Sequence, residues 1–359
     1  MNDLEYKKIA IIRLSALGDI IHTLPAFTLL REAFPYSKIS WIVEPVGAKL
    51  LENFQGIDEI VVLDLRKKGI FNILKQVRKI RSMYRKGKTF DLVLDFQGLL
   101  KSAILAWLLK GKVAVGFHKK NLREPLSRFF YKQSVDFFDE TNHVALKNIH
   151  LARSGSQVST SSIGDSDRKK INWYRLNIKW GDLTPWEKGV KQFLSRHQLE
   201  MGNFLIVNIG GGWESKLMHI HQYVTIINGI KNKYKTVILW GNEKEKKMAE
   251  EISQKTGTVM SDFFNFSELI LFITYSRLIV TGDTLALHLA DLLKRPTVGI
   301  FGPTSPSRNG SLMEESISIY KKLPCSFCYK KKCGTIECIQ KINIEKIIES
   351  IETLYERYN

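Results

Sequence analysis

The chain has 359 residues, 44% of them hydrophobic, and is long enough for two domains that each bury a core. This composition is typical of a globular soluble protein and excludes a disordered or fibrous one. Its 54 Lys and Arg against 36 Asp and Glu give a formal net charge of +18. Such a charge predicts a polyanionic partner, which could be nucleic acid, an anionic membrane face or a phosphorylated substrate.

The N-terminal residues lead straight from polar side chains into an apolar run. They lack the basic start, apolar middle and small-residue cleavage site of a signal peptide. The longest apolar stretch, at 267–280, is too short and too interrupted to span a bilayer. We therefore expect the protein to stay in the cytoplasm.

Short β-branched runs alternate with helical patterns in the first half of the chain. The strand-like runs are IAIIRL, ISWIVE, EIVVLDL, DLVLDFQ and VAVGF, and the helical patterns between them include PAFTLLREAF and LLKSAILAWLLK. This alternation predicts β/α units around a mainly parallel sheet.

One stretch of the first half, from Arg66 to Lys88, has ten basic residues and no acidic one. Apolar residues recur within it at helical spacing, at Ile70, Ile73, Leu74, Val77, Ile80 and Tyr84. A helix with an apolar stripe and a basic face suits the surface of an anionic membrane. The alternative is a core-packed helix whose lysines face the solvent.

The texture changes at the Ser-rich stretch 154–170, which is typical of a linker or a long surface loop. The alternation then resumes with FLIVNIGGG, TVILWGN, RLIVTGD and PTVGIFGP. We expect two doubly wound domains, 1–175 and 176–342, with a ligand cleft at the carboxyl ends of their strands. Residues 343–359 have the pattern of a terminal amphipathic helix, which we expect to pack back toward the N-terminal domain.

In the second half, a triple-glycine turn, Gly210, Gly211 and Gly212, follows a strand and precedes Lys216. Such a turn can direct backbone N–H groups toward phosphate, although glycines also serve plain tight turns. A second turn, at Asp283 and Thr284, opens a helix whose start favours phosphate. Asp283 could equally be a helix N-cap.

Asp19 stands where the first strand turns into a helix, a place that usually holds phosphate. It could cap that helix, but Thr23 is another cap just ahead of Pro25. If Asp19 does not cap the helix, its carboxylate would repel a phosphate bound opposite it. A hydroxyl group that the carboxylate can deprotonate is a better partner. The sequence therefore predicts a general base at Asp19.

These residues sit in five motifs that resemble the bacterial heptosyltransferases of lipopolysaccharide inner-core synthesis. The motifs are RLSALGDIIHTLPAF, DFQGLLKSAILAWLL, LREPLSRFFY, GGGWESK and TGDTLALHLADLLKRPTVGIFGPT. The resemblance is strongest to the type that adds the first heptose. It implies a GT-B fold and inverting transfer of L-glycero-D-manno-heptose from ADP-heptose to a Kdo hydroxyl of Kdo-lipid A. The expected place is the cytoplasmic face of the inner membrane, and no metal is required for catalysis.

The resemblance also implies roles for individual residues. Asp19 would be the general base, and Lys216 with the glycine turn would hold the pyrophosphate. The donor segment would contain Asp283, Thr284 and His288, with Glu245 on the ribose and Glu243 as a close rival. The acceptor residues would be Arg66, Asp95, Gln97, Lys101 and Arg123, whose basic members would hold Kdo carboxylates and lipid A phosphates.

The chain departs from the family pattern at two places. The family usually has a tryptophan and a proline after the lysine, whereas here Leu217, Met218 and His219 follow. Leu285 stands where the family often has glycine after Asp-Thr.

The four cysteines, Cys325, Cys328, Cys333 and Cys338, have a spacing that fits one tetrahedral metal. A structural zinc or iron and a set of reduced thiols are both open, and neither would take part in catalysis. A nucleic-acid-binding protein is the competing class, argued from the charge and these cysteines. The nearer rivals are a transferase adding the second or a later heptose and one that modifies proteins.

Overall fold

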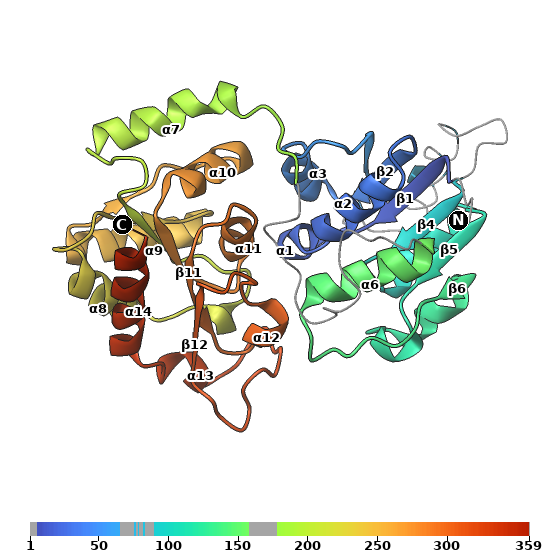
Figure 1. Cartoon of the computed structure of the whole chain (residues 1–359). Helices are drawn as coiled ribbons and strands as arrows, with labels where there is room; N and C mark the ends of the chain where they lie inside the picture. The colour runs from blue at the N-terminus through green and yellow to red at the C-terminus, as the bar shows by residue number, and fades with distance from the viewer. Residues whose placement is uncertain are drawn as a thin grey trace. The chain divides into compact units, whose positions relative to one another are not determined.

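The computed structural model describes residues 6–64, 75–76, 78, 82, 90–157 and 178–358 (Figure 1). It divides into two compact units, Met1–Gly181 and Asp182–Asn359. Most of the basic stretch 66–88, including Arg66, lies outside the described residues, as does the expected domain boundary at residue 175.

The first unit contains a six-stranded parallel sheet in the order β3-β2-β1-β4-β5-β6. The strands are β1 (Lys8–Ile12), β2 (Lys38–Val43), β3 (Glu59–Val62), β4 (Leu92–Asp95), β5 (Val113–Gly116) and β6 (Gln133–Ser134). The helices are α1 (Leu17–Ile21), α2 (Leu24–Ala33), α3 (Pro45–Leu51), α5 (Leu100–Leu108) and α6 (Val144–Ser156), with 3₁₀ turns η1 (Lys119–Asn121) and η2 (Pro125–Phe130).

The second unit contains another six-stranded parallel sheet, in the order β12-β11-β10-β7-β8-β9. Its strands are β7 (Leu205–Asn208), β8 (Thr236–Leu239), β9 (Val259–Met260), β10 (Leu278–Gly282), β11 (Thr297–Phe301) and β12 (Ile317–Tyr320). Its helices are α7 (Thr184–Arg196), α8 (Ile220–Ile230), α9 (Glu243–Thr256), α10 (Phe266–Tyr275), α11 (Leu285–Leu292), α12 (Pro306–Asn309), α13 (Glu337–Gln340) and α14 (Ile344–Arg357), with η4 at Glu214–Lys216.

The two sheets have the same topology when the strands of each unit are counted in chain order. In each unit the first strand lies in the middle of the sheet, and the second and third strands extend the sheet to one edge. The fourth strand lies on the other side of the first, and the last two extend the sheet to the opposite edge. The direction reverses between β1 and β4 in the first unit and between β7 and β10 in the second. Ligands of such sheets bind at the carboxyl ends of the strands at this switch point. The predicted doubly wound α/β units are confirmed.

The central strands are apolar because both faces of each sheet are covered by helices (Figure 1). Ile9, Ile11 and Ile12 of β1 and the whole of β7 are buried. Helix α14 contributes Ile347, Ile351 and Leu354 to the core of the second unit, where it packs on α8. Its expected packing toward the first unit stays a prediction.

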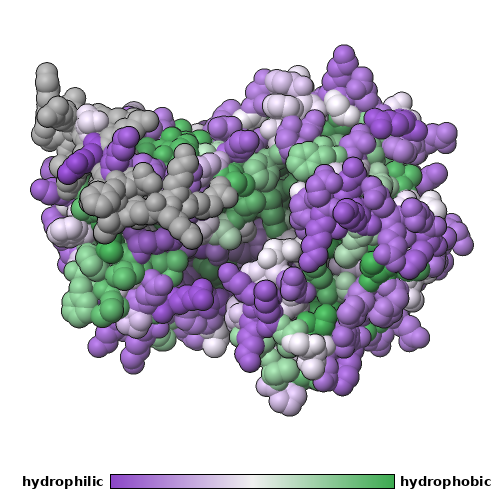
Figure 2. All heavy atoms as spheres, turned by 180° about the vertical axis from the view of Figure 1, so that it is seen from behind, coloured by the Kyte–Doolittle hydropathy of each residue, from purple (hydrophilic) through white to green (hydrophobic). Residues whose placement is uncertain are grey.

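The face seen in Figure 2 is largely hydrophilic, with smaller apolar areas among the hydrophilic side chains. In the part of the chain that the structure describes, no helix is long and apolar enough to cross a membrane.

Candidate active site

Asp19 lies in the first turn of α1, immediately beyond the carboxyl end of β1. Its Oδ2 accepts a hydrogen bond from the backbone N–H of Ala16 at 3.3 Å, so part of the carboxylate serves the start of the helix. The side chain of Asp19 is nevertheless 39% exposed. Thr23 precedes α2, but its hydroxyl donates to the carbonyl of Asp19 instead of capping that helix.

Arg13 is the residue that sequence reasoning missed in this loop. Its Nη2 lies 2.8 Å from Oδ1 of Asp19, and its side chain is only 8% exposed. Nη1 donates to the carbonyl of Phe96, at the end of the neighbouring strand β4. The guanidinium therefore orients the carboxylate of Asp19, whose side chain stays partly exposed. An arginine six residues before an aspartate was the only signal in the sequence.

Asp95 ends β4, and Gln97 follows in the loop that contacts the loop of Asp19. Oε1 of Gln97 accepts from the backbone N–H groups of Leu14 and Ser15, at 3.0 and 3.1 Å. Asp95 is fully buried, and burial raises the pKa of its carboxyl group despite its hydrogen-bond donors. Those donors are the hydroxyls of Ser102 and Tyr131 and the N–H groups of Gln97 and Gly98.

Asp95 and Gln97 therefore make internal hydrogen bonds, and their contact with an acceptor stays a prediction. Lys101 and Arg123 lie on the surface of the same unit, where a ligand could reach them. Lys101 at the start of α5 is 3.3 Å from Oε1 of Glu44. Arg123 precedes η2, and its neighbour Glu124 accepts from the backbone N–H of Leu100 at 2.6 Å.

In the second unit, three predicted donor residues form one buried network. Nζ of Lys216 donates to Oδ2 of Asp283 at 2.8 Å and to its backbone carbonyl at 2.9 Å. Nε2 of His288 lies 3.1 Å from Oδ1 of the same carboxylate. Burial alone would raise the pKa of Asp283, but the partners His288 and Lys216 outweigh it and hold that pKa far below its usual value.

The network explains why His288 is buried within α11. It is a partner of Asp283, on the next turn of the helix, and not an isolated packed histidine. The ring of Trp213 lies 4.4 Å from Nζ of Lys216 and covers the same ammonium group.

Asn208, the last residue of β7, was also missed. Its Nδ2 donates to the hydroxyls of Thr281 and Thr284, at 2.9 and 3.1 Å, and its Oδ1 accepts from Gly210 N–H. It thereby joins the glycine turn after β7 to the turn after β10. A polar residue ending an otherwise apolar strand was the available signal.

Glu245 holds the glycine turn from the other side. Its two oxygens accept from the N–H groups of Gly211 at 3.2 Å and Gly241 at 2.8 Å, linking the turns after β7 and β8. A Cβ at Gly210 would come within 2.7 Å of this carboxylate, so close approach is the reason for glycine there. Glu243 is exposed at the first position of α9.

The residues that depart from the family pattern have ordinary structural roles. Met218 is buried in the core, and the side chain of Leu217 packs under Gly211, where a Cβ would lie 2.8 Å from Leu217 Cδ2. His219 precedes α8, and Leu285 is the first residue of α11.

The cysteine segment packs beside the glycine turn. The hydroxyl of Ser215 donates to the carbonyl of Lys330 at 2.7 Å. The pKa of the Cys338 thiol is raised, first by burial and then by the other three thiols. The pKa of the exposed Cys333 is lowered, because backbone N–H groups donate to its sulfur. Within the described residues no three His, Cys, Asp or Glu side chains are grouped so that they could hold a metal ion. Cys325, Cys328, Cys333 and Cys338 therefore do not show the grouping that a tetrahedral metal site needs, and such a site is one of the two alternatives that their spacing leaves open.

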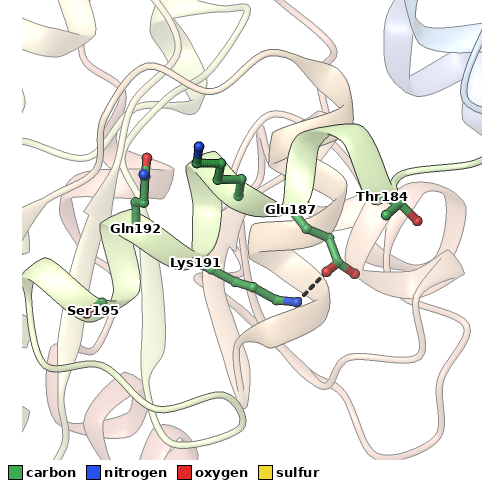
Figure 3. A pocket seen from close by; sticks show the side chains of 6 residues that line it. Thr184, Glu187, Lys191, Gln192 and Ser195 are labelled. Carbon is green, nitrogen blue, oxygen red and sulfur yellow. Dashed lines mark hydrogen bonds and ion pairs between the residues drawn. The ribbon is translucent and has the colours of Figure 1, made fainter.

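A shallow depression elsewhere lies along α7 (Figure 3). Its lining comes entirely from one helix, and an ion pair between Lys191 and Glu187 runs across it. It contains none of the residues discussed above, and we assign it no function.

Two doubly wound parallel sheets of the same topology, each in its own unit, are the GT-B fold that the solved family 9 structures also have. The sequence model of glycosyltransferase family 9 (heptosyltransferase) matches residues 78–338. The chain belongs to this family, as its motifs predicted.

Proteins similar to this chain have names that match this family. The chain is 28% identical over 359 residues to lipopolysaccharide heptosyltransferase 1 of Campylobacter coli, covering 96% of this chain and 98% of that protein. A family 9 glycosyltransferase from Veillonella parvula has a TM-score of 0.77 at 24% identity, with 99% of each chain covered. The E. coli heptosyltransferase WaaC with ADP has a TM-score of 0.71 at 20% identity, covering 97% of this chain and 99% of that one.

Proposed function

We propose that the protein transfers L-glycero-D-manno-heptose from ADP-heptose to a Kdo hydroxyl of Kdo-lipid A, with inversion at the anomeric carbon. Membership of the heptosyltransferase family carries this proposal. The name of the Campylobacter coli relative supports lipopolysaccharide as the product, and the ADP bound to the E. coli heptosyltransferase supports an ADP-linked donor.

Asp19 is assigned as the general base because its partly exposed carboxylate is oriented by the buried Arg13. It takes the proton of the acceptor hydroxyl as that oxygen forms a bond to the anomeric carbon. The bond between this carbon and the diphosphate oxygen breaks, and ADP leaves from the opposite face. A positioned base of this kind accelerates a reaction by roughly 100- to 10,000-fold.

Lys216 is assigned to the departing diphosphate. An ammonium group has three N–H donors, and Asp283 accepts two of them. We infer that the third donates to a phosphate oxygen, next to the N–H groups of the glycine turn and the start of α11. His288 and Asp283 fix the position of this charge without contacting the reacting atoms.

Glu245 is proposed to contact the ribose, as the family resemblance implies. Its two hydrogen bonds to Gly211 and Gly241 support a carboxylate already fixed at the edge of the donor turns. On the acceptor side, we propose that Arg66, Lys101 and Arg123 bind Kdo carboxylates and lipid A phosphates, while Asp95 and Gln97 hold the loop of the base. The enzyme would act at the cytoplasmic face of the inner membrane, where a lipid-anchored acceptor is available.

The test is incubation with ADP-heptose and a series of defined acceptors: Kdo-lipid A, the same acceptor already carrying one heptose, and a polypeptide. We expect the mass of one heptose to be added to Kdo-lipid A alone. Addition only to the heptosylated acceptor would instead define a transferase for the second heptose. Addition only to the polypeptide would define a protein heptosyltransferase.

A further inference from the structure

Three large apolar side chains of the first unit are exposed on two elements that pack against each other, α5 and η2. Trp107 of α5 is 59% exposed, and Leu126 and Phe129 of η2 are 64% and 81% exposed. We call these three residues the apolar patch. Side chains of this size cost free energy when they face water, so a group of them marks a contact surface.

The two elements that carry the patch pack against each other. Helix α5 contacts η2, and the rings of Trp107 and Phe130 lie 6.3 Å apart in an edge-to-face arrangement. In a 3₁₀ turn residues three apart lie on the same side, which aligns Leu126 with Phe129. Glu124 fastens the start of η2 to the start of α5 through the N–H of Leu100. The patch is therefore displayed by a fixed pair of elements.

Basic residues dominate the segment that bears the patch. Residues 100–134 contain eight Lys and Arg and a single acidic residue, Glu124. The exposed basic residues include Lys110, Lys112, Lys119, Lys120, Arg123 and Lys132. An apolar patch on a basic segment matches the interface of an anionic bilayer, where rings enter the acyl boundary and ammonium groups meet lipid phosphates.

We propose that the apolar patch inserts into the interface of an anionic membrane and docks the first unit on it. A second copy of the chain is a poor occupant because each copy has a net charge of +18 and the patch lies in a basic segment. The inference rests on the proposed function in one respect. A lipid-anchored acceptor requires its binding unit at the bilayer, and Arg123 lies two residues before η2.

The experiment uses the full-length protein and sedimentation with two kinds of vesicles, pure phosphatidylcholine and phosphatidylcholine containing phosphatidylglycerol. Leu126→Ser/Phe129→Ser removes two patch side chains. Met201→Ser/Phe263→Ser is the matched control, since these residues of the second unit are 51% and 62% exposed. We expect the wild type and the control to bind only the anionic vesicles, and the patch variant to bind at least about tenfold more weakly.

A second readout measures whether Trp107 enters the bilayer. Brominated lipids in the anionic vesicles should quench part of the fluorescence of the bound wild-type protein. Trp107→Phe should remove most of this quenching, whereas Trp186→Phe, which alters an indole that is 43% exposed in the second unit, should not.

Four results would overturn the proposal. The first two are a wild type that fails to bind vesicles and a patch variant that binds them equally well. The other two are quenching that survives in Trp107→Phe, and loss of self-association in the patch variant without any vesicle binding being seen.

Transfer to a deacylated, water-soluble acceptor separates the membrane proposal from the proposed function. The patch variant should keep that activity, and absence of transfer in every variant would count against the proposed function alone.

Discussion

The carboxylate of Asp283 is the centre of the polar network in the second unit, because Lys216 and His288 both bind it and its side chain is only 4% exposed. Charged partners in so little water interact strongly, and the network fixes the position of the lysine that we assign to the donor. Removing the charge of Asp283 or of Lys216 should therefore change both the stability of the fold and the binding of the donor.

Acid should destabilise the protein through Asp283. Its pKa is lower in the folded chain than the ordinary 3.8, so its stabilising contribution is complete above that value and is lost as the pH falls below it. Asp283→Asn should lower the free energy of unfolding at neutral pH, and the gap to the wild type should narrow below about pH 4. Urea unfolding across this pH range measures it. A gap that is independent of pH would contradict the assignment.

Lys216→Ala should weaken both ADP binding and transfer, because it removes the charge on the diphosphate. It also leaves Asp283 with one fewer partner, and breaking a buried pair costs about 3–5 kcal/mol of stability. Titration calorimetry with ADP and a thermal melt measure the two effects. Lys216→Arg is the control that keeps the charge. Full ADP affinity in a folded Lys216→Ala protein would exclude the role.

At the scale of elements, the loop after β4 supports the loop after β1. Gln97→Ala would leave the N–H groups of Leu14 and Ser15 without their acceptor, at a cost of about 1–3 kcal/mol. We expect kcat to fall while ADP affinity stays the same, because only the loop of Asp19 moves. Gln97→Glu keeps an acceptor oxygen and should recover part of kcat. Loss of stability without any change in kcat would make Gln97 merely structural.

The sequence patterns predicted these elements because buried parallel strands are short apolar runs that end in polar or glycine turns. Asp19, Lys216 and Asp283 could be picked out since each follows such a run. The sequence could not predict the contacts of Arg13, Asn208 and Glu245, because these contacts join residues at the ends of different strands. The burial of Asp95 was equally hidden, since it depends on Tyr131, which lies far along the chain.

At the scale of the whole molecule, each of two units of one topology contains residues that we assign to the proposed transfer. In the first unit, the carboxylate of Asp19 is paired with Arg13 after β1. In the second unit, the glycine turn and Lys216 follow β7, and the start of α11 follows β10. The surplus of basic residues suits both an anionic donor and an anionic, lipid-anchored acceptor.

The central claim is that Asp19 removes the acceptor proton during heptose transfer. Asp19→Asn tests it most directly, because the amide has nearly the same shape and keeps one oxygen that can accept from Arg13 but is a far weaker base. Single-turnover transfer from ADP-heptose to Kdo-lipid A should fall by roughly 100- to 10,000-fold, with ADP affinity unchanged by calorimetry. Transfer at the wild-type rate, or a loss of ADP binding as large as the loss of rate, would contradict the assignment of Asp19 as the base.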